Sequence, residues 1–116
     1  MSESTIIYVF ILFTLYMVYK KYTQYKVLKL VPTLLEQGGQ IIDVRTEEEF
    51  MNAHKSGSMN IPLHKLEKEI KQFDNTKAII LCCASGSRSA MAKRILLSNG
   101  FENVHNAGKW KALKKF

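Results

Sequence analysis

The chain has 116 residues, which is enough for one compact domain and too few for two of ordinary size. Its formal charge of +7 is compatible with an anionic membrane surface or with a nucleic acid. No helix-turn-helix pattern and no basic-aromatic RNA-binding motif accompanies the lysines, so we expect no nucleic-acid partner.

The first segment in chain order is apolar. Residues 5–19 read TIIYVFILFTLYMVY, carry no charge, and are apolar on every side of a helix. Such a helix would be roughly 22 Å long, short of the roughly 30 Å bilayer core, but interfacial tyrosines and snorkelling lysines lengthen the effective span. We predict a membrane anchor with its basic flank over residues 1–23, the alternatives being a signal sequence and a buried core helix.

The charges around this segment predict its orientation. No Lys or Arg precedes it, and a group of lysines follows within ten residues: Lys20, Lys21, Lys26 and Lys29. The positive-inside rule then predicts a single-pass membrane protein with its C-terminal domain in the cytoplasm. The only two cysteines, Cys82 and Cys83, are adjacent and therefore poorly suited to a mutual disulfide, and free thiols fit a reducing compartment.

From residue 24 to 116 short apolar strands alternate with helical patterns. Pro32 suits the first turn of a helix, Gly38-Gly39 suit its end, and Thr46 with Glu49 predicts a capping box. We expect strands at 26–30, 40–44, 77–83 and within 101–108, and helices at 32–37, 46–54, 64–73, 89–100 and 109–116. This alternation predicts an α/β domain with a small parallel sheet and helices on both faces.

The segment CCASGSRSA, residues 82–90, lies where a buried strand turns into a helix. Small residues and Gly86, suited to positive φ, let the loop point successive N–H groups inward as an anion cradle. A Cys83 thiol in that cradle would ionise readily, and Arg88 would add a positive charge beside it. Cys82 faces the other side of the sheet and is interpreted as a packing residue, with a resolving thiol as the alternative. The simpler interpretation of the same pattern is that Cys83 is a small hydrophobic residue buried at the end of a strand.

Three segments resemble the rhodanese-like family of single-domain sulfurtransferases, in the order typical of that family. They are IIDVRTEEEFMNAHKSGSMNIP at 41–62, CASGSRS at 83–89 and NGFENVHNAGKW at 99–110. The chain departs from the family pattern at Ala53 and Lys55, and it keeps only Gly108 of a usual glycine pair. These departures concern turns of the scaffold.

The resemblance implies a two-step transfer of sulfane sulfur through a persulfide on Cys83, with Arg88 as the second catalytic residue. It implies that Asp43 and Arg45 support the site structurally, as does His54, and that no cofactor or metal is needed. The donor would be thiosulfate or a persulfide, including a protein persulfide, and the acceptor a thiol or cyanide. The substrate-binding loop would comprise Ala84, Ser85, Gly86, Ser87, Arg88 and Ser89.

Two other functions are compatible with parts of this pattern. A non-catalytic rhodanese scaffold could bind a partner or sense sulfane sulfur, although inactive relatives usually lose the cysteine that this chain keeps as Cys83. A cysteine phosphatase of the dual-specificity type needs five residues between cysteine and arginine, whereas here four separate Cys83 from Arg88. Ala84 and Ser85 stand where thiosulfate-using relatives often have basic side chains, so we expect weak thiosulfate turnover and a preference for persulfides.

Overall fold

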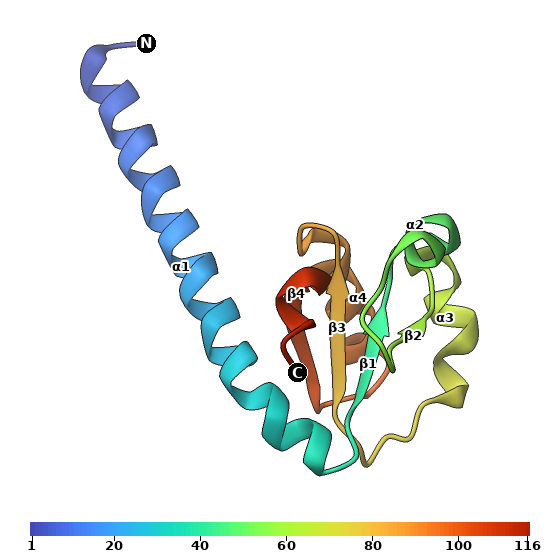
Figure 1. Cartoon of the computed structure of the whole chain (residues 1–116). Helices are drawn as coiled ribbons and strands as arrows, with labels where there is room; N and C mark the ends of the chain where they lie inside the picture. Colours follow the sequence, from blue (N-terminus) through green and yellow to red (C-terminus); the bar gives the residue numbers. More distant parts are fainter.

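The computed structural model describes residues 1–116 as a long N-terminal helix packed against a four-stranded parallel sheet (Figure 1). The strand order across the sheet is β2-β1-β3-β4. The strands are β1 (Gln40–Asp43), β2 (Met59–Asn60), β3 (Ile79–Cys83) and β4 (Val104–Lys109). Every pair is parallel, so the carboxyl ends of all four strands meet at one edge. The predicted α/β fold with a small parallel sheet is confirmed.

Helices cover both faces of the sheet, as the sequence predicts. On one face α4 (Ser87–Ser98) and α3 (Leu66–Glu69) pack over Ile42, Leu81 and Cys83. On the other face α1 (Glu3–Glu36) and η3 (Trp110–Leu113) enclose residues that include Ile41, Ile80 and Cys82. The short helix α2 (Glu47–Asn52) begins at the predicted capping box of Thr46 and Glu49. Both faces of the central strand β3 are therefore buried, which explains its uninterrupted apolar sequence.

The helix α1 is continuous from Glu3 to Glu36, so the predictions of a strand at 26–30 and of a new helix opening at Pro32 are wrong. Val27, Val31 and Leu34 recur at helical spacing and contact the sheet, and this packing favours helix over strand. Pro32 lies inside the helix with its side chain exposed. An internal proline costs about 3 kcal/mol, which burial of the adjoining apolar face offsets.

The two halves of α1 have different surroundings. Residues 1–22 are all exposed, and burial begins with the partly buried Thr23 and Gln24. By its length and composition α1 is apolar enough to cross a membrane, and no residue of its apolar stretch is buried. The chain reverses direction through the turn at Gly38, so α1 runs antiparallel to the strands (Figure 1). Its apolar N-terminal half therefore projects past the carboxyl edge of the sheet.

Four further elements differ from the sequence prediction. The strand β2 has two residues, too few to leave a periodic pattern, and the sequence predicts no strand there. The expected helix at 64–73 divides into η1 (Leu63–Lys65), α3 and η2 (Ile70–Gln72). The expected helix at 109–116 is the single 3-10 turn η3, whose three-residue period brings Trp110 and Leu113 to the same buried side. The helix α4 begins at Ser87, two residues earlier than expected, because Gly86 already serves as its N-cap.

Candidate active site

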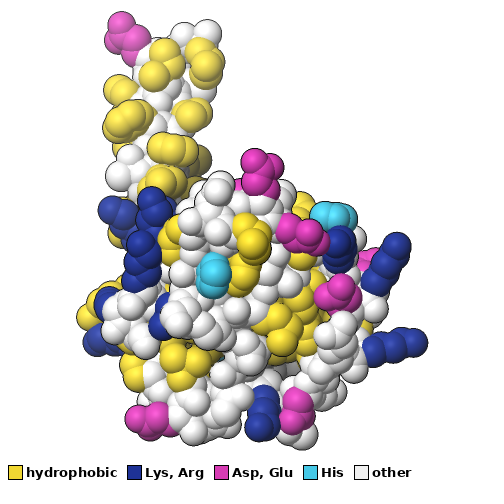
Figure 2. Space-filling view, turned by 45° about the vertical axis from the view of Figure 1, so that its right-hand side comes forward, with side chains coloured by type: hydrophobic (Ala, Val, Ile, Leu, Met, Phe, Trp, Pro, Cys, Tyr) yellow, Lys and Arg dark blue, Asp and Glu magenta, His cyan; other side chains and the backbone are white.

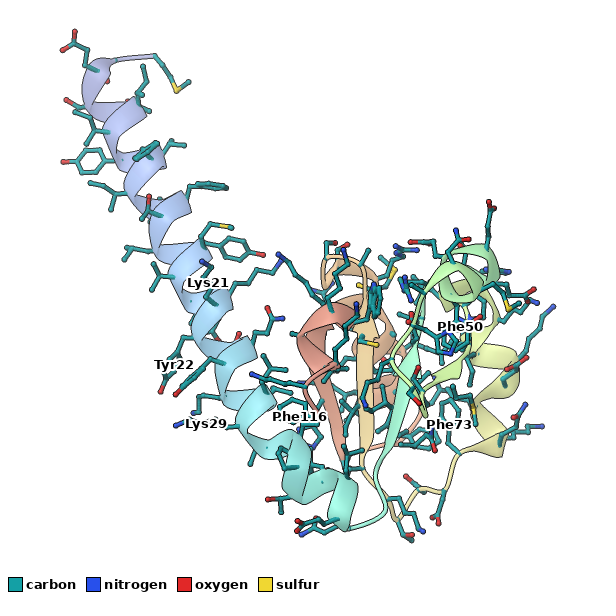
Figure 3. All side chains as sticks on the ribbon, viewed as in Figure 1. Lys21, Tyr22, Lys29, Phe50, Phe73 and Phe116 are labelled. Atoms are coloured by element: carbon teal, nitrogen blue, oxygen red, sulfur yellow. The ribbon has the colours of Figure 1, made fainter.

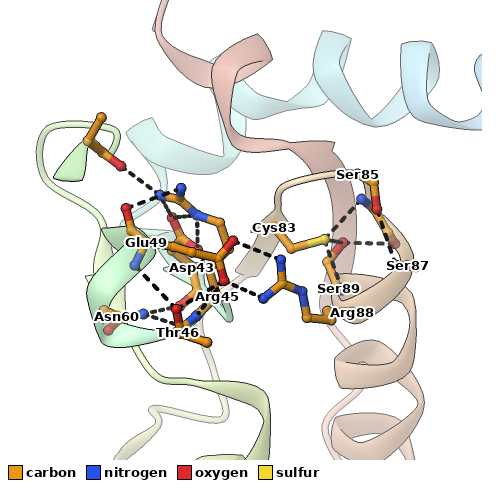
Figure 4. A network of polar contacts seen from close by, with 12 residues as sticks. Asp43, Arg45, Thr46, Glu49, Asn60, Cys83, Ser85, Ser87, Arg88 and Ser89 are labelled. Carbon is orange, nitrogen blue, oxygen red and sulfur yellow. Dashed lines mark hydrogen bonds and ion pairs between the residues drawn. The ribbon is translucent and has the colours of Figure 1, made fainter. Parts of the chain in front are cut away.

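Cys83 is the last residue of β3 and lies fully buried at the carboxyl edge of the sheet. The loop that follows turns back around its sulfur before α4 begins (Figure 4). Gly86 makes this turn possible with φ of 102°, a left-handed conformation that side chains disfavour. A Cβ at Gly86 would also lie 3.4 Å from the Cα of Gly108 on β4. That separation is an ordinary van der Waals contact, so the positive φ, and not lack of space, explains glycine at position 86.

The Sγ of Cys83 lies among hydrogen-bond donors of the loop. The Gly86 N–H donates to it at 2.9 Å, the Ser89 N–H at 3.5 Å, and the Ser89 hydroxyl lies 3.4 Å away. Burial alone raises the pKa of the Cys83 thiol, but the hydrogen bonds from Ser89, Gly86 and Ser85 together outweigh it, and the pKa is lowered. Donors converging on a sulfur stabilise its anionic form, so the geometry suits a thiolate nucleophile.

Ser89 has a larger part in this cradle than the sequence indicates, because its side chain also contributes. Its hydroxyl lies 2.7 Å from the Asn106 Oδ1 and 3.0 Å from the Gly86 carbonyl oxygen, in addition to its contact with Cys83. Asn106, from β4, further donates from Nδ2 to the Gly86 carbonyl and accepts from the Gly108 N–H. Asn106 is absent from the predicted site, since nothing in the local pattern of β4 marks it as a partner of a loop twenty residues away.

Arg88, predicted to add a fixed positive charge beside the cradle, is paired with Glu49 of α2 (Figure 4). Its two terminal nitrogens donate to the two carboxylate oxygens at 2.7 and 3.0 Å. The guanidinium, with a hydrogen bond from Thr46 assisting, lowers the pKa of Glu49 to about 2. Glu49 in turn raises the pKa of Arg88. The arginine is therefore fixed in place and its charge is paired, and Glu49 is a site residue that its capping-box role conceals in the sequence.

Asp43 and Arg45 form a buried ion pair beneath this network. The guanidinium binds both carboxylate oxygens, with the shortest contact 2.7 Å from Nη2 to Oδ2, and also donates to the Ala53 carbonyl oxygen at 2.8 Å. Its central carbon lies 4.5 Å from the centroid of the Trp110 ring. The Asn60 amide closes the turn by donating to the carbonyl oxygens of Asp43 and Arg45. Through these contacts the ion pair holds the segment after β1 against Ala53 and Trp110.

The other predicted residues are more peripheral. Ala84, Ser85 and Ser87 are exposed, and the hydroxyls of the two serines lie 3.2 Å apart. His54 stacks on Phe50 with the ring centroids 3.8 Å apart and contacts the Phe50 carbonyl oxygen. Figure 3 labels Phe50 at α2, on the side of the domain away from α1.

Cys82 faces the α1 side of the sheet, in the opposite apolar cluster from Cys83, as strand alternation predicts. Burial raises the pKa of its thiol, and the nearby Asp43 charge raises it further. Both thiols are free. The two neighbouring cysteines therefore have opposite character: Cys82 is suited to packing and Cys83 to ionisation.

Comparison with known proteins identifies the family to which this arrangement belongs. The family model of the rhodanese-like domain matches residues 28–114. The Bacillus subtilis protein YrkF is 41% identical over 66 residues, covering 57% of this chain and 36% of YrkF. The thiosulfate sulfurtransferase PspE of Escherichia coli is 36% identical over 69 residues, covering 58% of this chain and 66% of PspE. The chain thus spans less than two thirds of the length of either relative.

A solved structure agrees with the sequence comparison. The rhodanese with anions from E. coli superimposes with a TM-score of 0.60 and 34% identity, covering 64% of this chain and 89% of that one. The superposition therefore includes most of the E. coli chain and about two thirds of this one.

Proposed function

The chain belongs to the rhodanese-like domain family, and from this we propose that it is a sulfurtransferase that works through a persulfide on Cys83. The observation that carries the proposal is the ring of donors around the Cys83 Sγ, which lowers the pKa of its thiol despite full burial. A packing cysteine needs no such donors, and the neighbouring Cys82 has a raised pKa. The similarity to PspE, named a thiosulfate sulfurtransferase, supports the same chemistry.

The proposed reaction has two steps. The Cys83 thiolate attacks the outer sulfur of a donor such as thiosulfate, an S–S bond forms on Cys83, and the sulfur–sulfur bond of the donor breaks to release sulfite. The loop N–H groups then hold the anionic persulfide. A thiolate or cyanide attacks the terminal sulfur, carries it away, and leaves the Cys83 thiolate as it began. Each half-reaction moves one sulfur atom and one electron pair, so no cofactor is required.

Within this proposal the donor is a persulfide in preference to thiosulfate. Ala84 and Ser85 follow Cys83 directly, are exposed, and offer no positive charge to a sulfonate. Arg88 is engaged by Glu49, which reduces the positive charge available to an incoming dianion. Both features favour a less charged donor.

Initial-rate kinetics test the activity. With the donor and cyanide both varied, wild-type enzyme should give the parallel double-reciprocal lines of a ping-pong mechanism, and a small-thiol persulfide should have a higher kcat/KM than thiosulfate. Cys83→Ser should be inactive, and Cys82→Ser, the matched control, should keep most of the activity. A dead Cys82→Ser beside an active Cys83→Ser would contradict the assignment of the nucleophile.

We further propose that the exposed N-terminal half of α1 anchors residues 24–116 to a membrane from the cytoplasmic side. Exposed apolar side chains over residues 6–19 support the anchor, and the lysines that follow support the orientation. Carbonate extraction of membranes should leave the protein in the pellet. Because Cys83 exposes no surface, the side is best tested with a cysteine introduced at the exposed Ser56. A membrane-impermeant maleimide should label it only after lysis, and equal labelling in intact cells would reverse the orientation.

A further inference from the structure

A groove of about 510 Å³ lies between α1 and α4, on the outer flank of the active-site loop. Ser85, Gly86 and Asn106 form part of its lining, whereas Cys83, Arg88 and Glu49 do not, so the groove borders the cradle from outside and does not include the thiol. It is strongly basic, and the cations in its lining come from three elements: Lys20, Lys21, Lys93, Arg94 and Lys109. Figure 2 shows dark-blue side chains gathered where the helix leaves the domain, and Figure 3 labels Lys21 at this level of α1.

These five cations have no counter-charges. No Asp or Glu lines the groove, and none of the five takes part in any of the three ion pairs of the structure. The Lys20 ammonium makes a cation–π contact with Tyr16, 5.8 Å from the centroid of the ring, and this contact does not neutralise its charge. Like charges drawn together by two helices repel one another, and the surface favours an anion that would relieve this repulsion. Lysine and arginine together are the side chains that proteins use to bind phosphate.

The rest of the lining is mixed: it includes polar side chains such as Thr23, Gln24 and Asn106 and four apolar side chains, of which Met17 belongs to the exposed N-terminal half of α1. Met17, Val27 and Leu97 contribute to the groove, and the exposed apolar surface of α1 continues from Met17 toward the N-terminus. Because α1 runs antiparallel to the strands, this apolar surface rises on the same side as the active-site loop (Figure 1). A ligand that fills the groove can thus place an anionic group among the cations and a hydrocarbon chain along α1. An anionic phospholipid has this combination.

We propose that the groove between α1 and α4 binds the headgroup phosphate of an anionic phospholipid. The proposal rests on the membrane anchoring proposed above and assigns a lipid to the junction between anchor and domain. The bound phosphate lies against Ser85 and Gly86, the outer side of the loop whose inner side holds Cys83. The lipid therefore fixes the domain with its active-site edge toward the membrane surface.

Native mass spectrometry of the full chain in neutral detergent micelles tests the assignment, with phosphatidylglycerol or phosphatidylcholine added at equal concentration. Wild type should retain phosphatidylglycerol preferentially, as one bound lipid. Lys93→Gln/Arg94→Gln should bind it roughly 25-fold more weakly, since each cation near an anionic surface is worth about a fivefold change. Lys68→Gln/Lys71→Gln removes two exposed cations that do not line the groove, and should bind as wild type does.

Equal retention of both lipids, or equal retention by the groove variant, overturns the proposal. Titration with inorganic phosphate separates the two sources of the anion. Tight phosphate binding without a preference for phosphatidylglycerol would mean a site for a soluble anion and would also overturn the lipid assignment. Persulfide loading of Cys83, measured on the same samples, keeps the two proposals distinct: loading without lipid retention refutes only the lipid site, and lipid retention without loading refutes only the sulfurtransferase.

Discussion

Replacing Glu49 with glutamine should weaken the attachment of Arg88 while leaving the N-terminus of α2 intact. Glutamine keeps the shape of the side chain and can still serve the capping box with Thr46. It removes the charge that receives the Arg88 nitrogens at 2.7 and 3.0 Å. The substitution therefore isolates the ion pair that joins α2 to the active-site loop.

The size of the effect follows from the pKa of Glu49, which lies at about 2 against an ordinary 4.5. A difference of that size corresponds to at most about 3 to 4 kcal/mol of unfolding free energy. The two side chains are 34% and 36% exposed, so solvent screening reduces the expected contribution to about 1 kcal/mol. Because the folded-state pKa is depressed, this stability is fully present above the ordinary pKa of 4.5 and is lost as the pH falls toward about 2.

Urea denaturation of the full chain in neutral micelles measures this, with fluorescence of the single, buried Trp110 as the probe. At neutral pH Glu49→Gln should be about 1 kcal/mol less stable than wild type, and the difference should shrink as acid protonates Glu49. Glu48→Gln removes a neighbouring charge that has no ion pair, and should change stability by only a few tenths of a kcal/mol. Equal stability of Glu49→Gln and wild type at neutral pH, or a difference that persists unchanged into acid, would refute the reasoning.

Three further predictions concern the loop and the domain boundary. Ser89→Ala removes a hydroxyl 3.4 Å from the Cys83 Sγ, so the pKa of the thiol should rise and persulfide loading of Cys83 at neutral pH should slow roughly tenfold; an unchanged pH profile of loading would show that the backbone N–H groups suffice. Removing residues 1–23 should release a soluble, active domain, because burial begins after Tyr22; aggregation of the product would mean that the exposed half of α1 belongs to the core. An alanine inserted between Ser85 and Gly86 should suppress sulfur transfer, and full activity would show that loop length does not matter.

The sequence predicted most reliably those elements whose pattern arises from burial on both sides. The runs at 40–44 and 77–83 are β1 and β3, because neighbours cover both faces of each strand. The sequence predicts a strand at 26–30 and a new helix at Pro32 in place of the second half of α1. The reason is that the lysines of this segment lie between apolar residues and that proline is common in the first turn of a helix. Val27, Val31 and Leu34 recur at helical spacing in the sequence, but their contact with the sheet is visible only in the fold.

The active site likewise combines features that are local in the sequence with contacts that are distant in it. The cradle of Cys83 and Gly86 is local, and its spacing and small residues could be interpreted without a structure. The partners of the cradle are distant in sequence: Glu49 lies 39 residues before Arg88, and Asn106 lies 17 residues after Ser89. Parallel strands brought these segments to one edge, and no local pattern encodes which side chains meet there.

The most direct test of the account is the intact mass of the protein after incubation with a sulfane-sulfur donor and removal of the excess. Wild type and Cys82→Ser should each gain the mass of one sulfur atom, and a thiol or cyanide acceptor should remove it. Cys83→Ser, which retains the Cys82 thiol, should gain nothing. Sulfur found on Cys83→Ser, or none found on wild type with any persulfide donor, would contradict the assignment of Cys83 as the carrier.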